Sequence, residues 1–146
     1  MSEQSQHDFA VYLPNGSLAL LVDAKTRKGT STHWAAELRR NLIAHGALSL
    51  KTMFLLATPG AVYVWRSGLP ADALASHEFV AGQLFRPYLE AAGFTPDAVN
   101  GDAFELIVGA WLRDVVHGSA ERNAHLEGTG LPSLLKGGRV ESEATQ

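Results

Sequence analysis

The chain contains no cysteine, which excludes disulfide bonds, cysteine-ligated zinc and thiol catalysis. It also lacks any apolar run approaching the roughly 18 residues that a membrane-spanning helix needs, and its N-terminal stretch is too polar for the apolar core of a signal peptide. Together these absences favour a cytoplasmic protein with no membrane partner.

Charged residues are also scarce, at 18% of the chain, whereas apolar residues make up 46%. This balance is typical of a folded globular protein, and 146 residues are enough for one domain with a substantial core. We therefore predict a single domain over residues 1–146. Residues 1–7 are expected to form a flexible arm, 8–117 the core, and 118–146 a polar tail with a short helical turn.

The few charges are unevenly distributed. The net charge of −3 argues against general affinity for nucleic acid, but residues 25–51 hold six basic residues against one acidic residue. Residues 67–146 hold five basic residues against eleven acidic ones. A basic stretch could contact phosphates, although solvated loop and helix charges explain it equally well. The candidate nucleic-acid contacts in this stretch are Arg27, Lys28, Arg39 and Arg40.

Residues 8–25 predict a β-hairpin, because two apolar segments are joined at Pro-Asn-Gly-Ser, a strong turn signal. Two registers are compatible with this turn. A two- or four-residue loop pairs Leu13 with Leu18, whereas a three-residue loop pairs Leu13 with Ser17 and shifts the strands by one residue. The first register gathers the bulky side chains on one face, so we expect it. That bulky set is Phe9, Val11, Leu13, Leu18, Leu20 and Val22.

The expected register places Asp8 directly opposite Asp23, with Lys25 on the same face. Two carboxylates at such a separation, roughly 5 Å between Cβ atoms, repel each other. A divalent cation would turn that repulsion into a binding site, because carboxylate oxygens are the natural ligands of Mg²⁺. The alternative is that these are ordinary strand-end residues with Lys25 as a surface ion-pair partner. The spacing alone leaves both interpretations open.

The arrangement of Asp8, a hairpin and then Asp23-Ala24-Lys25 resembles the D…(D/E)xK signature of the PD-(D/E)XK nuclease superfamily. The segments Gly-Thr-Ser-Thr-His-Trp-Ala-Ala-Glu-Leu, Tyr-Val-Trp and Phe-Glu-Leu look like a bacterial branch of it. The resemblance implies a restriction-endonuclease-like α/β fold, with a mixed sheet that opens with a hairpin and is flanked by helices. It also implies Mg²⁺-dependent (or Mn²⁺-dependent) hydrolysis of phosphodiesters. Asp8, Asp23 and the Ala24 carbonyl would bind the metal, and Asp8, Asp23 and Lys25 would be catalytic.

The sequence departs from the superfamily pattern in three places. His7 stands where a proline often precedes the first aspartate, and Asp23 replaces the commoner glutamate. Only seven residues precede Asp8, so the N-terminal helix that usually carries a further acid is expected to be absent. Glu3 could supply that acid, a second chain could supply it in a homodimer, or the site is incomplete.

The remaining segments predict mostly regular structure. A helix over Ser31–His45 should place Trp34, Leu38, Leu42 and His45 on the sheet, and 76–92 reads as a further helix interrupted at Pro87. The later helix over Gly101–His117 has core periodicity, so Trp111 and Glu105 are assigned to the core. Strands are expected over Thr52–Ala57 and Ala61–Trp65, a short helical turn around Leu131, Leu134 and Leu135, and a loose tail over Gly137–Gln146.

Three functions remain compatible with the sequence. The first is a metal-dependent endonuclease or phosphodiesterase acting on DNA or RNA through Asp8, Asp23 and Lys25. The second is a catalytically incomplete nuclease-like fold that binds nucleic acid or protein. The third is a sheet-and-helix protein of unrelated role, in which the pairing of the two aspartates is accidental.

Overall fold

The computed structural model describes residues 7–118 and 124–142. The predictions for the first six residues, including a role for Glu3, lie outside these ranges, as do those for the last four residues of the tail. None of the helices in the described ranges combines the length and the apolar character that crossing a membrane requires.

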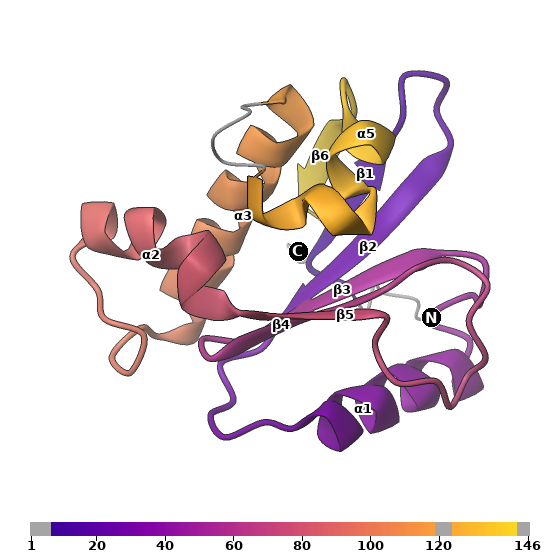
Figure 1. The fold of residues 1–146 in the computed structure, drawn as a ribbon, viewed down its shortest axis with the longest axis horizontal. Coiled ribbons are helices and arrows are strands. Elements are labelled where there is room, and N and C mark those ends of the chain that lie inside the picture. The colour runs from indigo at the N-terminus through magenta and orange to yellow at the C-terminus, as the bar shows by residue number, and fades with distance from the viewer. Residues whose placement is uncertain (1–6, 119–123, 143–146) are drawn as a thin grey trace.

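The fold is α/β, with a mixed sheet of six strands in the order β5-β4-β3-β2-β1-β6 (Figure 1). Strand β3 runs parallel to β2, and every other neighbouring pair is antiparallel. The predicted mixed sheet opening with a hairpin and flanked by helices is therefore confirmed. The strands are β1 (Phe9–Tyr12), β2 (Leu18–Ala24), β3 (Met53–Ala57), β4 (Ala61–Trp65), β5 (His77–Val80) and β6 (Arg139–Ser142).

Helix α1 covers one face of the sheet, and the later helices cover the other (Figure 1). The helices are α1 (Thr32–Ala44), α2 (Ala81–Ala92), α3 (Gly101–His117), the 3-10 helix η1 (Ala124–Thr129) and α5 (Leu131–Leu135). The larger core lies under α2 and α3 and includes Phe85, Phe104 and Trp111, whose rings meet edge to face. Trp111 is thus a core residue, as expected.

The predicted register of the hairpin is confirmed where the strands contribute to the core. Phe9 pairs with Val22 and Val11 pairs with Leu20. All four side chains are buried in the larger core. A slip of one residue would have moved one strand's bulky side chains to the opposite face, which explains why the apolar pattern identified this register.

The turn itself follows the other register. The Leu13 N–H donates to the Ser17 carbonyl at 2.9 Å, which closes a three-residue loop in which Gly16 has φ +90°. The pairing then skips Ala19 in a β-bulge, so the turn and the core satisfy different registers. Leu18, expected in the core, is 41% exposed as a result.

The prediction of a helix from residue 76 is wrong in its first part. His77–Val80 is strand β5, which pairs with β4 and leads directly into α2. Pro87 was expected to interrupt the helix, but α2 continues through it to Ala92. Burial of Leu84, Phe85 and Leu89 offsets the roughly 3 kcal/mol that an internal proline costs a helix.

The prediction of a loose tail after Gly137 is also wrong. Strand β6 pairs along the whole of β1, and Val140 packs against the larger core. A four-residue polar strand carries too weak a pattern to predict, and its partner is distant in the chain. The predicted helical turn is confirmed as α5, in which Leu131 and Leu135 are buried.

Gly109 allows α3 to pack closely on β1. A Cβ atom at Gly109 would lie 2.9 Å from the ring of Phe9, whereas one at Gly82 in α2 would meet only the Arg86 guanidinium at 3.6 Å. We expect Gly109→Ala to lower the free energy of unfolding by about 1–2 kcal/mol through overpacking. The matched variant Gly82→Ala should raise it by up to about 1 kcal/mol. Urea unfolding measures both, and equal effects would contradict this account of the α3–β1 contact.

Candidate functional site

Asp23 lies near the end of β2 and is 1% exposed. Its carboxylate accepts hydrogen bonds from the Nδ1 atom of His7, at 3.2 and 3.3 Å, and from the Asp8 N–H at 3.1 Å. The ring of His7 also contacts Phe54 of the α1-facing core. Asp23 therefore points toward the α1 side of the sheet and is held there by polar contacts.

His7 connects the beginning of β1 to the segment after α1. Its Nε2 atom lies 2.6 Å from the Ala47 carbonyl oxygen, while Nδ1 faces the Asp23 carboxylate. Because a neutral imidazole has a single N–H, the ring donates both bonds only as an imidazolium. The predicted flexible arm is therefore incorrect at His7, which is buried and bonded on both sides.

Asp8 is half-buried and occupies the end of the β1–β2 ladder. Its Oδ2 atom accepts a hydrogen bond from the Ala24 N–H at 2.7 Å, and its own N–H donates to the Val22 carbonyl and to the Asp23 carboxylate. The Asp8 carboxylate thus takes the place of the backbone carbonyl that a longer β1 would have offered. The two aspartates are therefore neighbours, linked through the Asp8 N–H, and each carboxylate accepts a hydrogen bond from one backbone N–H.

Burial raises the pKa of Asp8 above its ordinary value, and the negative charge of Asp23 raises it further. The hydrogen bond from Ala24 and the positive charges of Lys25 and His7 act in the opposite direction without cancelling the rise. An ionised Asp8 is therefore unfavourable for the folded state. Carboxylates with this property occur often at functional sites.

Glu105 is an acidic residue of α3 that lies near Asp8, although the apolar periodicity of the helix predicted a core position for it. Burial raises the pKa of Glu105, and the negative charges of Asp8 and then Asp102 add to the rise. Glu105 lies on α3 with Asp102 and Gly109 along one stripe, and all three line a cavity of about 340 Å³ beside Phe9. In the sequence, the three-residue spacing of Asp102 and Glu105 indicates that the two acids lie on the same face of this helix.

Lys25 follows β2 directly and is exposed. Its N–H donates to the Ala57 carbonyl, which extends the β2–β3 pairing by one residue. Lys25 and Asp23 line an open cavity of about 470 Å³ with residues from the second half of α1, but Asp8 does not line it. The structure thus brings the three signature residues to one end of β2 without placing them around one cavity.

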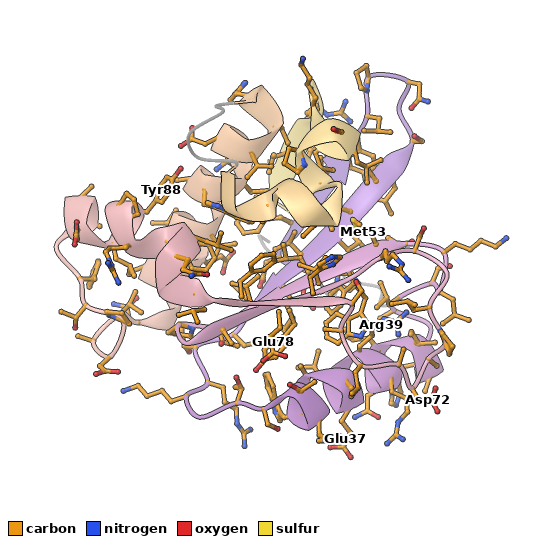
Figure 2. The ribbon with its side chains drawn as sticks, viewed as in Figure 1. Glu37, Arg39, Met53, Asp72, Glu78 and Tyr88 are labelled. Carbon is orange, nitrogen blue, oxygen red and sulfur yellow. The ribbon has the colours of Figure 1, made fainter. Side chains whose placement is uncertain are left out.

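The four predicted nucleic-acid contacts lie in different environments. Arg39 is fully buried between α1 and the sheet, where it donates to the carbonyls of Leu69 and Pro70 and stacks over Trp65 (Figure 2). The prediction that Arg39 contacts nucleic acid is therefore corrected. Arg40 lies on the outer side of α1 and pairs with Glu37, whereas Arg27 and Lys28 line a different cavity.

Few side chains near the end of β2 could serve as metal ligands. Within 7–118 and 124–142, no three histidine, aspartate or glutamate side chains are grouped closely enough to hold a metal ion. Mg²⁺ binds through one or two carboxylates and fills its remaining positions with water and substrate phosphate, so Asp8 and Asp23 are the carboxylates that such an ion would use here. The hydrogen bonds of Asp23 to His7 oppose that use, because the ion would have to replace them.

Replacement of Asp8 tests whether its negative charge destabilises the folded protein. The folded protein binds the Asp8 proton more tightly than the unfolded chain does, because the pKa of Asp8 is raised above its ordinary value of 3.8. Ionisation of Asp8 therefore lowers the free energy of unfolding, and this loss grows as the pH rises from 3.8 through the raised pKa. Asp8→Asn keeps an oxygen for the Ala24 N–H and should be more stable than the parent near neutral pH. We expect at most about 1 kcal/mol, because solvent screens a half-exposed group.

Urea unfolding of both proteins between about pH 3 and 7 should show this difference shrinking toward acid. Asp8→Ala, which also removes the acceptor for Ala24, serves as the control and should be less stable than Asp8→Asn. A parent that gains stability relative to Asp8→Asn as pH rises would refute the proposed sign.

The link between His7 and Asp23 can be measured with a double-mutant cycle. His7→Ala leaves the buried Asp23 carboxylate without the hydrogen bonds of the ring and should cost about 1–3 kcal/mol. Combining it with Asp23→Asn removes the uncompensated charge, so the double variant should lose less than the sum of the two single variants. Additive losses in urea unfolding would show that the two side chains are not coupled.

Comparison with protein-family models, with curated proteins and with solved structures finds no match to this chain. The residues at the end of β2 and their geometry are therefore the basis for assigning a function.

Proposed function

We propose that the protein is a Mg²⁺-dependent nuclease that hydrolyses phosphodiester bonds of DNA or RNA. The observation that carries the proposal is the interlocking of Asp8 and Asp23 through the backbone at one end of the hairpin, immediately before Lys25. The order of hairpin, crossing helix and parallel strand supports it, because the resemblance noted in the sequence implies such a core.

Asp8 and Asp23 would hold the ion, with the Ala24 carbonyl as a further oxygen donor; Mn²⁺ could replace Mg²⁺. Such an ion, when bound, polarises the phosphodiester and activates water. The exposed ammonium of Lys25 offers a mobile positive charge to the phosphate oxygens as negative charge develops on them. The raised pKa of Asp8 fits this role, since a cation would relieve the repulsion between the two carboxylates.

Substitution of the signature residues tests the proposal. Asp23→Ala and Lys25→Ala should each lower Mg²⁺-dependent cleavage of labelled DNA and RNA by at least about 100-fold. Lys51→Ala, an exposed lysine before β3, serves as the control and should cleave at the parental rate. Circular dichroism would verify that each variant is folded. Parental cleavage by either folded signature variant would refute the proposed site.

The second candidate function is a nuclease-like fold that binds nucleic acid or protein without cleaving it. The burial of Asp23 and its hydrogen bonds to His7 favour this candidate, because they occupy a carboxylate that a metal ion needs. A homodimer could instead complete the site with an acid from the second chain.

Metal binding separates the two candidates. A shared Mg²⁺ site should stabilise the parent by RT ln(1 + [L]/Kd), about 2.7 kcal/mol at a hundredfold excess over Kd. Asp8→Asn should reduce that gain. Unchanged thermal stability in millimolar Mg²⁺ and Mn²⁺, together with no cleavage, would support the binding fold.

A further inference from the structure

The cavity lined by Arg27 and Lys28 has a volume of about 270 Å³ and lies beyond the carboxyl ends of the parallel strands β2 and β3. The loop from β2 to α1 forms one wall through residues 27–30, and the turn from β3 to β4 forms another through residues 58–61. Pro96 and Asp97 from the connection between α2 and α3 complete the lining. Ligands in α/β proteins commonly bind beyond the carboxyl ends of parallel strands.

The lining of the cavity holds more basic than acidic residues. Arg27 and Lys28 both line it, and Asp97 is the one acidic residue in its lining. Among the described residues no carboxylate lies within ion-pair distance of Arg27 or Lys28, whereas Arg40 pairs with Glu37 elsewhere on the surface. Cations without acidic partners in a concave site attract anions.

Both cations are also held in place. The Lys28 ammonium donates to the Asp97 backbone carbonyl at 2.9 Å, which bridges two walls of the cavity and leaves two further N–H donors. The Arg27 guanidinium stacks over the ring of Trp34, with 5.7 Å between its carbon and the ring centroid. Ordering these long side chains in advance lowers the entropic cost of binding a ligand.

The walls leave room for a ligand to approach the backbone. A Cβ atom built on Gly29 or Gly60 would meet no other atom within 4 Å, so both loops border open space. The hydroxyl of Thr30, bonded to the Tyr63 hydroxyl at 2.8 Å, adds a polar group to the lining. A small anion can thus meet cations and a hydroxyl together.

We infer that this cavity binds a backbone phosphate of a nucleic acid, with Arg27 and Lys28 as its ligands. The inference rests on the proposed nuclease function and specifies where the substrate is held. Arg27 follows Lys25 by two residues, so the bound phosphate would flank the one that is cleaved. Contacts of this kind position a nucleic acid without reading its bases.

The test measures equilibrium binding of a fluorescein-labelled DNA duplex in EDTA, where metal-dependent cleavage cannot occur. Combining Arg27→Gln with Lys28→Gln should weaken binding about tenfold or more at roughly 100 mM salt. It should also reduce the slope of log affinity against log salt concentration by about 1–2, because up to two phosphate contacts are lost.

The matched control combines Lys51→Gln with Arg66→Gln. It removes the same two charges at the other end of the sheet, where β3 begins and β4 ends, and both residues are exposed. This variant should keep the parental salt slope. Equal losses in the two double variants would show general charge attraction and overturn the inference, as would failure of the parent to bind the duplex.

The outcome is separate from that of the nuclease proposal. Parental binding that depends on Arg27 and Lys28, without cleavage by the parent in Mg²⁺, would retain the phosphate site and reject the nuclease. Cleavage that is abolished by Asp23→Ala, with an unchanged salt slope in the Arg27 and Lys28 variant, would retain the nuclease and reject the phosphate site.

Discussion

The hydrogen bonds between Asp8 and the last residues of β2 hold together the end of the sheet at which the candidate site lies. Asp8 replaces a missing backbone acceptor for Ala24, and its N–H contributes to holding the buried carboxylate of Asp23. These bonds depend on the register of the hairpin, which the bulky core residues enforce. The bulge near the turn absorbs a one-residue mismatch, so the loop chemistry does not disturb the acids.

Acidic side chains whose burial is unfavourable gather at the same end of the sheet. Asp8 and Glu105 both have raised pKa values, mainly because of burial and then because of neighbouring negative charge. The His7 ring contacts the Asp23 carboxylate through Nδ1 and the Ala47 carbonyl through Nε2. Ionisable groups whose pKa values are shifted by burial occur often at functional sites. Their presence at one sheet edge is the physical reason to assign a function there.

Two features at the end of β2 favour different functions. The adjacent aspartates and Lys25 favour metal-dependent chemistry, whereas the pairing of Asp23 with His7 favours a site that binds without cleaving. The basic cavity beyond β2 and β3 is compatible with both, because a nucleic acid could be held there in either case. A metal ion would have to displace the hydrogen bonds that Asp8 and Asp23 make in the folded protein, so these two residues distinguish the two candidate functions.

The sequence by itself determined the register of the core-facing part of the hairpin and most of its main elements, because apolar periodicity is a local property. Only the tertiary structure decided which charges are accessible. It buried Arg39 under α1, placed Glu105 near Asp8, and drew His7 and β6 into the fold. Each of these outcomes depends on contacts between residues far apart in the chain, for which local patterns carry no information.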